Sequence, residues 1–599
     1  SVVRYQQQAR EAIRDIAARG RLPILAGGTG FYINAVVKDT DFTEETGISH
    51  KLSYDSDELW LEYQFFLPQQ VKDFGATLES GGNDVIRFGT KNLDYGYWLN
   101  GKFTPVYTLR TDLWYHAMLK MTNEGTKLYI NHKLMADNIP VKNVKIDNIR
   151  YTVGKTAKGT VYIDDIIAKA MKPLPDDYVP APVKPEKKNP DTIVGMQSCN
   201  LWREGTHFGW DSIAAFPERV TYLGFYDEGS SEVKDWETKW MVEHGIDVEI
   251  YCWYRQSASN SEPIKRPRNS FALHDGYFNS EYSDQMKFII SWENAGRCGG
   301  PKDFEENMVP YWIEQYFKDD RYLKIDNKPV VGMYMYEYLI KDFGSPEGIK
   351  KEIDYLRNEC IKAGFDGIEL IMTSGTSNKS TLSNIKSAGV DALYCYSWGY
   401  NTFMPEVQKN GMNAQLETGI IDIMPTVGMG FDTLPWERGP GGIMDKENLV
   451  GLLEWARDDF MPRAGRLGRR FITLDNWNEY GEGHWFFPSN YAGFDYLDAV
   501  REVFTNGGEH EDIKPTEKQK ERVNHLYVQS RKVEKTFIAK STIKKLEEGE
   551  DESAFRLVGK IDFDNGSDKA EDYPIDKQIA DLRLERGVIA GEATDGDPG

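Results

Sequence analysis

The sequence predicts a multidomain protein in which a (β/α)8 TIM-like barrel follows an N-terminal antiparallel β-sandwich of the jelly-roll type. Three observations predict this architecture. At 599 residues, the chain is too long for one ordinary domain. Period-two alternation of apolar and polar residues dominates residues 47–172, whereas apolar β-type runs alternate with amphipathic helical segments throughout residues 192–535. A proline-rich stretch, residues 173–191, separates the two patterns and predicts an extended linker rather than a packed element.

The sandwich is predicted from short β-type runs such as "ELWLEYQFFL" and "KLYIN", which Gly, Asn and Asp residues separate. Regular turn signals between such runs favour antiparallel sheets. The adjacent Asp164 and Asp165, at the end of a predicted strand, leave two interpretations open: a structural Ca²⁺ site or a solvated strand end. Aromatic residues make up 13% of the chain, which fits large cores and also surfaces that stack on sugar rings.

The barrel is predicted from the number of β–α repeats in residues 192–535. Candidate strands such as "IDVEIYCWY" and "RFITLDNW" alternate with helical segments such as "PEGIKKEIDYLRNECIKAG". That segment begins with proline and acids and stops at Gly364, as helices do. A doubly wound sheet is the alternative, but no glycine-rich phosphate loop follows the first strand.

The two ends of the chain differ from the rest. Residues 1–46 pair a helical pattern with the apolar run "LPILA" and a glycine turn, and they look foreign to the remainder of the sequence. Residues 536–599 are acidic, have little apolar periodicity and are expected to be disordered. The chain begins without Met and without an apolar signal-peptide region, so we expect its native N-terminus to be missing.

Composition excludes several classes of function. The chain carries 94 acidic against 72 basic residues, which argues against a nucleic-acid partner. No apolar run is long enough to predict a membrane span. The five cysteines are scattered, with no CxxC pair, so neither a disulfide framework nor a metal centre is expected, and no cofactor is required. The oligomeric state stays open.

Candidate substrate-binding residues stand where the predicted barrel strands end. The active sites of such barrels lie at the carboxyl ends of the strands. Aromatic rings there can take the apolar faces of sugars, while carboxylates and amides bind hydroxyl groups. The pattern predicts a neutral, polyhydroxylated substrate. The candidates are Trp253, Tyr254, Trp292, Glu293, Asn294, Tyr336, Trp398, Asp432, Asn478, His484 and Trp485.

The strongest catalytic signal is the pair Glu479 and Glu482 in "DNWNEYGEGHW". Gly481 and Gly483 favour a bend, in which residues three apart face the same way with Cβ atoms ~5–6 Å apart. Retaining glycosidases hold two carboxyls ~5–5.5 Å apart, and inverting ones ~6.5–9.5 Å. One carboxyl must then stay protonated at neutral pH. The alternative is that one glutamate caps the turn and the other is solvated.

Three stretches of the chain resemble known families. The string "NWNEYGEGHWFFPS", with "GIDVEIYCWY" and "MKFIISWENAG" before it, resembles glycoside hydrolase family 99 and its WbsX-like relatives over about residues 192–530. Many of those relatives carry a glycosyltransferase label. The string "WYHAMLKMTNEGTKLYINHKLM" is similar to laminin-G and concanavalin-like jelly rolls, which often bind glycans. Residues 1–45, with "RGRLPILAGGTGFYINA", resemble tRNA dimethylallyltransferases, but the P-loop that those enzymes need is missing.

The family 99 resemblance implies roles for the pair. Glu479 matches the base that acts on the 2-hydroxyl of the substrate and leads to a 1,2-anhydro sugar. Glu482 matches the general acid/base, so the outcome is net retention. Tyr480 replaces the usual Trp of the motif, and Phe487 stands where a Glu is usual, which we expect to alter substrate choice.

The predicted function is that of a glycoside hydrolase, endo-acting on a polysaccharide or glycan. A WbsX-like glycosyltransferase in surface polysaccharide synthesis is the alternative; it needs an activated sugar donor, and no DxD-type motif stands in a strand-end loop. A non-catalytic carbohydrate-binding protein is the third hypothesis. The relatives imply an extracellular, periplasmic or cell-surface location in a bacterium.

Overall fold

The computed structural model describes residues 47–523, apart from residues 53–55, 154–159, 172, 204–209, 211–212, 214–215, 256–261, 437–438, 440 and 509. Beyond them, it describes three short strands: β24 (Arg556–Leu557), β25 (Arg583–Glu585) and β26 (Val588–Ala590). The predicted fragment 1–46 and the rest of the predicted tail lie outside the described residues. The chain forms two compact units: one holds the residues up to Leu174 with Glu262–Lys265, and the other holds the remainder from Pro175.

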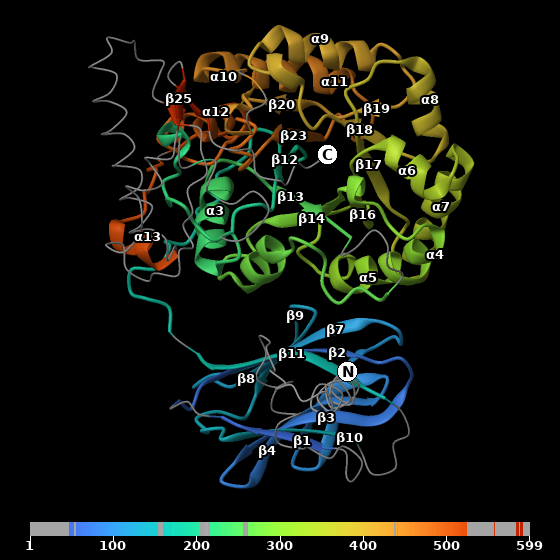
Figure 1. Cartoon of the computed structure of the whole chain (residues 1–599), viewed down its shortest axis with the longest axis vertical. Helices are drawn as coiled ribbons and strands as arrows, with labels where there is room; N and C mark the ends of the chain where they lie inside the picture. The colour runs from blue at the N-terminus through green and yellow to red at the C-terminus, as the bar shows by residue number, and fades with distance from the viewer. Residues whose placement is uncertain are drawn as a thin grey trace, which may run out of the picture. The chain divides into compact units, whose positions relative to one another are not determined.

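The first unit consists of two antiparallel sheets (Figure 1). Strand β2 shows why the sequence alternates: every second residue is buried. One sheet has the order β1 (Gly47–Lys51), β10 (Asn148–Val153), β3 (Val71–Ser80), β4 (Asn83–Asn92), β5 (Asp94–Leu99) and β6 (Lys102–Thr108). The other has the order β11 (Tyr162–Ala170), β2 (Leu59–Phe66), β7 (Trp114–Met121), β8 (Thr126–Ile130) and β9 (Lys133–Ile139).

An aromatic core joins these two sheets. Tyr63 of β2 packs edge-on against Tyr151 of β10, with ring centroids 5.2 Å apart, and Phe65 contacts Phe74 of β3 at 6.0 Å. The predicted antiparallel character is confirmed, and the jelly-roll class stays a prediction.

The acidic pair lies near the start of β11, beside an irregularity in its pairing with β2, and contacts a cation. Carboxylate oxygens of Asp164 and Asp165 lie 3.0 and 2.9 Å from the Lys265 ammonium, which belongs to the same unit. This ion pairing is a third arrangement, besides the two that the sequence left open. The Ca²⁺ site stays a prediction.

The proline-rich linker differs from the expected free spacer. Residues 175–191 contain no helix or strand, but they pack against the second unit, to which they belong. The Tyr178 hydroxyl donates to Asp235 at 2.6 Å, and the Val179 carbonyl accepts from the Tyr282 hydroxyl at 2.8 Å. The Val179 side chain is buried. Tyr178 and Val179, which stand between the prolines, anchor this segment to the second unit, and the proline content alone does not predict these contacts.

The second unit is built on a curled sheet whose strands are parallel along its main order. Strands β18 and β19 pair at one end of the strand order and β20 and β23 at the other, and only Met424 and Pro425 separate β19 from β20. The two ends of the sheet therefore meet in one stretch of chain, as the predicted barrel requires. The strands are β12 (Ile193–Ser198), β13 (Val248–Trp253), β14 (Lys287–Trp292), β16 (Lys328–Met333), β17 (Glu369–Thr373), β18 (Ala392–Tyr394), β19 (Asp422–Ile423), β20 (Thr426–Gly428) and β23 (Phe471–Asp475).

Helices connect these strands and surround the sheet (Figure 1). Helix α7 begins with Pro346, as predicted; Ser345 caps it, and Gly364 follows its end with a φ of 99°. The helices are α3 (Ser231–Glu243), α4 (Pro301–Asp303), α5 (Val309–Trp312), α6 (Tyr336–Phe343), α7 (Pro346–Lys362), α8 (Lys379–Ser387), α9 (Pro405–Leu416), α10 (Lys446–Trp455), α11 (Met461–Arg463), α12 (Asp495–Phe504) and α13 (Glu517–Val523).

Short irregular elements complete this unit. Strand β15 pairs with β16, and β21 pairs with β22, both antiparallel. Their bounds are β15 (Lys324–Ile325), β21 (Gly430–Phe431) and β22 (Gly442–Ile443), and the 3-10 and π turns are η1 (Pro217–Arg219), η2 (Ala272–Gly276), η3 (Tyr277–Asn279), η4 (Asn294–Gly296), η5 (Phe304–Met308), η6 (Ile313–Phe317), η7 (Gly399–Asn401), η8 (Leu434–Trp436) and η9 (Ala456–Phe460).

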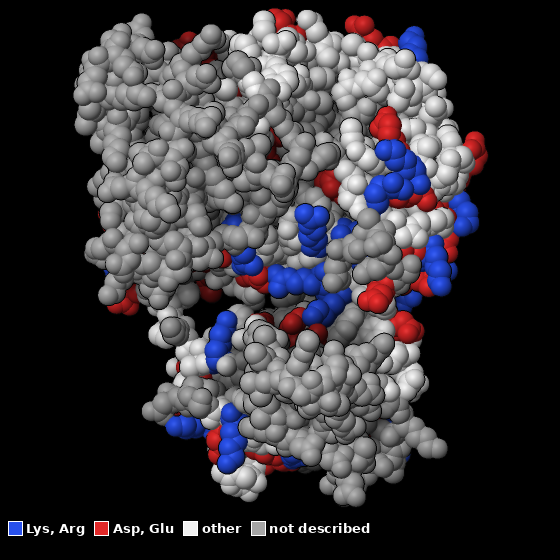
Figure 2. All heavy atoms as spheres, viewed as in Figure 1, with Lys and Arg blue, Asp and Glu red and all other residues white. Residues whose placement is uncertain are grey.

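Two surface properties bear on partners. Figure 2 shows basic and acidic side chains interspersed on the described part of the visible face, so charge there is mixed rather than of one sign. Within the described ranges, no helix combines the length and the apolar character that crossing a membrane requires.

Candidate active site

A tight turn after β23 carries the two glutamates. The strand "FITLD" is fully buried, and the backbone pairs again between Glu479 and His484, which closes the turn. Gly483 has a φ of 72°, and a Cβ there would lie 2.5 Å from the backbone oxygen of Asp432. The glycine is therefore needed for the bend that the sequence predicted.

Both glutamates of this turn line one cavity of about 640 Å³ in the second unit. The cavity lies at the carboxyl ends of the parallel strands, where barrel enzymes place their chemistry. Its other lining residues are Gln197, Ser198, Cys199, Leu201, Ile250, Cys252, Tyr254, Arg268, Asn269, Ser291, Glu293, Ala295, Gly296, Tyr334, Met335, Tyr338, Thr373, Tyr394, Tyr396, Trp436 and Asn476.

Glu479 is the buried member of the pair. It is 4% exposed, and its Oε1 has no hydrogen-bond partner among the described residues. Burial raises the pKa of this carboxyl well above its ordinary value, and the neighbouring Cys199 and Glu482 raise it further. The free site therefore favours a protonated Glu479.

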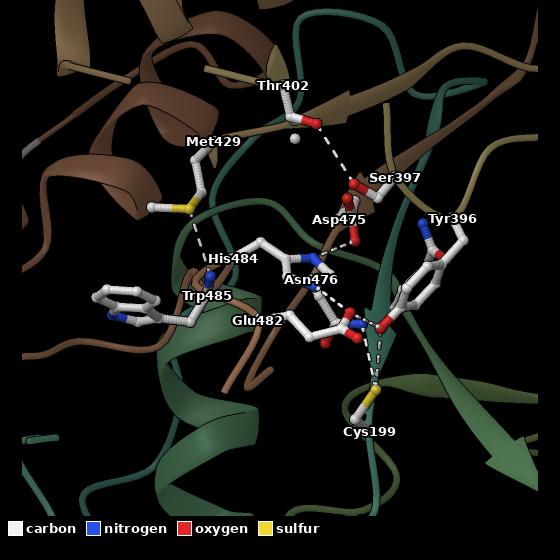
Figure 3. Close-up of polar contacts among 12 residues, drawn as sticks. Cys199, Tyr396, Ser397, Thr402, Met429, Asp475, Asn476, Glu482, His484 and Trp485 are labelled. Carbon is white, nitrogen blue, oxygen red and sulfur yellow. Dashed lines mark hydrogen bonds and ion pairs between the residues drawn. The ribbon is translucent and has the colours of Figure 1, made fainter. Parts of the chain in front are cut away.

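Glu482 has cationic and polar partners. Its Oε2 lies 3.1 Å from His484 Nε2 and accepts from the Tyr396 hydroxyl at 3.4 Å (Figure 3). The other ring nitrogen of His484 lies 2.8 Å from Asp475 Oδ1. Burial opposes the charge, but the carboxylates of Asp475 and Glu482 raise the pKa of His484 to about 10. An imidazolium thus bridges the side chains of Asp475 and Glu482.

Tyrosines and a third carboxyl form further walls of the cavity. Tyr334 and Tyr396 meet edge-to-face, with ring centroids 5.9 Å apart. The Glu293 side chain accepts from the backbone N–H groups of Ala295 and Gly296 at 3.2 and 3.4 Å. Burial raises the pKa of Glu293 as well. The arrangement offers ring faces and hydrogen-bonding groups around a carboxyl pair.

The structure places four predicted site residues on the cavity: Tyr254, Glu293, Glu479 and Glu482. His484 contacts Glu482 from a fully buried position. Three predicted tryptophans instead lie in the core, which corrects the expectation that they bind substrate. Trp253 and Trp292 both pack against Trp312 of α5, and Trp485 donates to Ser489.

Strand alternation explains this correction. The cavity is lined by residues 250 and 252 of β13 and residue 254 just after it, and by residue 291 of β14 and residue 293 just after it. Successive side chains of a strand point to opposite faces, so Trp253 and Trp292 point outward into the helix layer. The cavity does lie at the strand ends, as predicted, but only every second residue there faces it.

The remaining predicted residues hold the walls rather than line them. Asn294 exchanges two hydrogen bonds with the backbone of Met335, at 2.7 and 2.8 Å, which ties the loop after β14 to the loop after β16. The others make these contacts: Asn478 donates to Glu228 at 2.7 Å, Asp432 pairs with Arg219 at 2.8 Å, Trp398 donates to the Thr426 carbonyl at 3.1 Å, and Tyr336 begins α6.

Several residues that line the cavity are not among the predicted site residues. Tyr334 directly follows β16, whose last residue is Met333, so the position after the strand end was the available signal. Arg268 and Asn269 come from the connection between β13 and β14, where no periodic pattern marks them. Cys199 follows β12 in the same way as Tyr334 follows β16.

Comparisons with known proteins identify two segments. Residues 1–68 match the family model described as IPP transferase, and residues 301–416 match the one described as Glycosyltransferase WbsX. The first match runs beyond the predicted boundary at residue 46 and includes β1 and β2. A tRNA dimethylallyltransferase of Lachnoclostridium phytofermentans is 59% identical over 44 residues, which are 7% of this chain and 14% of that protein. The chain thus spans about a seventh of the curated relatives that it matches.

Among solved structures, the GH99 endo-alpha-mannosidase from Bacteroides thetaiotaomicron is 18% identical and covers 52% of this chain and 96% of its own, with a TM-score of 0.37. A glycoside hydrolase-like protein is 13% identical and covers 55% and 99%, with a TM-score of 0.40. The predicted resemblances to tRNA dimethylallyltransferases at the N-terminus and to WbsX-like proteins further along are confirmed.

Proposed function

We propose that the second unit is a retaining glycoside hydrolase that acts on a polysaccharide or glycan through Glu479 and Glu482. One observation carries the proposal: two carboxyls from a single turn after β23 line the same cavity. The volume of about 640 Å³ falls within the ~300–1,000 Å³ of typical ligand sites. The WbsX match over residues 301–416, which includes β16 to β18, supports a carbohydrate-active unit.

The chemistry follows the roles that the resemblance gives. Glu479 takes the proton of the substrate's 2-hydroxyl, whose oxygen attacks the anomeric carbon. The bond to the leaving oxygen breaks while Glu482 donates a proton to that oxygen. Water then opens the 1,2-anhydro sugar: Glu482 accepts a proton from the water, and Glu479 returns its proton to the 2-oxygen. Configuration is retained overall, and both carboxyls regain their starting states.

These steps begin with Glu479 ionised and Glu482 protonated, so the proton that burial favours on Glu479 in the free site must leave that carboxyl before it can take the proton of the 2-hydroxyl. The other surroundings of the pair suit the steps. Tyr254 and Tyr334 offer ring faces to a sugar, and Glu293 offers an acceptor to its hydroxyls. The His484 imidazolium and the Tyr396 hydroxyl hold the Glu482 carboxyl in place. Endo action, which leaves both ends of a glycan chain outside the cavity, is part of the proposal.

The second candidate function is glycosyl transfer, which the description of the matching family model favours. A transferase would use the same cavity but would need an activated sugar donor. Donor-free release of reducing ends therefore separates the two. A non-catalytic carbohydrate-binding role is the third candidate, and it predicts binding without release.

The test is reducing-end release from a panel of α-mannans, algal and plant polysaccharides and host glycans. The full chain is compared with Glu479→Gln and Glu482→Gln. Glu337→Gln is the matched control, because Glu337 follows β16 at the same end of the barrel but is exposed and lies off the cavity. We expect release by the parent and the control, and a loss of at least ~100-fold in both pair variants. Release that survives both pair substitutions contradicts the proposal.

A further inference from the structure

Four metal-ligating side chains converge away from the cavity. His244 ends α3, Asp498 lies in the first turn of α12, and His510 and Asp512 belong to the segment that follows α12. The Asp512 Oδ1 atom lies 3.2 Å from His244 Nε2 and 2.9 Å from His510 Nε2. Ligand atoms of these three residues lie within 4.8 Å of one another, and Asp498 Oδ1 lies 3.7 Å from His244 Nε2.

His244 is held as a metal ligand would be. Its Nδ1 lies 2.6 Å from the Trp240 carbonyl, so this nitrogen donates its proton there. In the neutral ring, Nε2 then carries a lone pair. The side chain is fully buried, yet Nε2 makes no hydrogen bond with any described residue. A buried lone pair 3.2 Å from a carboxylate oxygen is unfavourable unless a positive charge lies between them.

The donor set and its spacing suit one class of cation. Two imidazole nitrogens and two carboxylate oxygens are ligands that Zn²⁺ accepts in tetrahedral geometry, at ~2.0–2.2 Å from the metal. That geometry separates neighbouring ligand atoms by about 3.3–3.6 Å, close to the spacings here. Two carboxylates and two neutral imidazoles also balance a charge of +2.

Outer contacts fix two of these ligands. The Trp240 carbonyl orients His244, and the Lys446 ammonium lies 3.1 Å from the other oxygen of Asp498. Partners of this kind orient metal ligands in known sites. Phe494 stacks on the His244 ring at 6.1 Å and closes one side with an apolar surface.

We propose that His244, Asp498, His510 and Asp512 form a structural zinc site that fixes the segment around residues 510–512 to α3 and α12. This revises the expectation from the sequence that the chain has no metal centre. Cysteine spacing gave no sign of the site because its ligands are His and Asp, and they come together only in the fold. The proposal stands whether or not the chain hydrolyses glycans.

The alternative occupant is a proton. His244 with a second proton would pair directly with Asp498 and Asp512, and those carboxylates do raise its pKa against the effect of burial. Both occupants stabilise the same contacts, but only one of them needs added metal. The test therefore measures metal content and metal-dependent stability.

The experiment uses the untagged full chain, because a histidine tag would itself bind the ion. After removal of metal with a chelator, ZnCl2 is titrated by calorimetry, metal content is measured by mass spectrometry, and Tm is followed by fluorimetry. We expect about one Zn²⁺ per chain and a Tm that rises by several degrees. Asp512→Asn and His510→Gln should each weaken Zn²⁺ binding at least ~10-fold.

Glu511→Gln is the matched control, because it removes a carboxylate from the same segment at an exposed position outside the cluster. Its Zn²⁺ binding should equal that of the parent. Zn²⁺ binding that survives both ligand substitutions overturns the proposal, because the ion would then lie elsewhere. A parent that binds no Zn²⁺ and keeps its Tm also overturns it, and assigns the cluster to a protonated His244.

Discussion

His484 and Glu482, two residues apart in the turn after β23, approach to 3.1 Å between Nε2 and Oε2, and the opposite nitrogen of His484 lies 2.8 Å from Asp475. The imidazole thus links a cavity carboxyl to a carboxyl that is fully buried at the end of the strand. The position of the Glu482 carboxyl and the stability of the strand end therefore depend on the same side chain.

The charge of His484 should make stability fall as the pH rises. Its folded pKa of about 10 exceeds its ordinary value of 6.5, so the stabilisation is complete below pH 6.5 and is lost as the pH rises towards 10. At about 1.4 kcal/mol per pH unit of that window, the upper bound is ~5 kcal/mol. Urea unfolding at a series of pH values measures it. His484→Gln, which keeps an amide donor, should lose this pH dependence, and an unchanged slope in that variant would contradict the bridge.

Glu479 should set the acidic limb of the activity profile. In the proposed role it acts as a base and must be ionised, whereas its raised pKa keeps it protonated in the free site. We therefore expect kcat/KM to increase with pH through that raised pKa, since kcat/KM reports ionisation in the free enzyme. A pH–rate profile with a soluble glycan checks this. A decrease over the same range would instead make Glu479 the proton donor and Glu482 the base.

Glu479 should also affect stability independently of activity. A carboxyl with a raised folded pKa stabilises the fold fully below its ordinary value of 4.5, and this stabilisation is lost as the pH rises through the folded value. Glu479→Gln cannot ionise, so at neutral pH we expect it to unfold at higher urea concentration than the parent. The same variant should be inactive, and equal midpoints at pH 4 and pH 8 for parent and variant would contradict the burial argument.

Removing either of two tyrosine hydroxyls should distinguish a residue that acts on Glu482 from one that only packs near the cavity. The Tyr396 hydroxyl donates to Glu482 at 3.4 Å, whereas the Tyr336 hydroxyl is buried and finds no hydrogen-bond partner in the part of the chain that the structure describes. A hydrogen bond to a charged group contributes ~1.5–3 kcal/mol, so Tyr396→Phe should lower kcat by ~10-fold or more. Tyr336→Phe should leave kcat unchanged. Equal kcat values for the two variants would remove Tyr396 from the catalytic arrangement.

Local sequence pattern predicts much of this fold. The alternation of β2 predicts its buried face, and the proline with acids at the start and the glycine at the stop predict the bounds of α7. Such features depend on residues a few positions apart. The packing of residues 175–191 depends on distant partners such as Tyr282, and no local pattern reveals it.

The site was predicted in part for the same reason. The glutamate pair is a local motif, and the glycines beside it indicated the bend. The residues that hold the turn are distant: Asn478 bonds Glu228, 250 positions away, and Arg219 donates to the Tyr480 carbonyl across 261 positions. To predict which way the side chains of Trp253 and Trp292 point, one must know the register of each strand. The local sequence pattern defines that register only to within one residue. If the register shifted by one residue, side chains that face the cavity would instead face the core, and the reverse.

The glycine between the two glutamates should be needed for activity. A Cβ at Gly481 would overlap the ring of Trp436, which itself lines the cavity. Gly481→Ala must displace either this ring or the turn, and both movements change the positions of Glu479 and Glu482. Because small misplacements of catalytic groups cost ~100-fold in rate, we expect kcat to fall by about that factor.

Gly451→Ala is the matched control for that substitution. Gly451 lies within α10, and a Cβ there meets nothing within 4 Å. Alanine in a helix interior is more favourable than glycine by ~0.5–1 kcal/mol, so this variant should be slightly more stable and fully active. Steady-state kinetics and urea unfolding of both variants make the comparison. If Gly481→Ala kept the parent kcat, the close approach of Trp436 would have no part in placing the carboxyl pair.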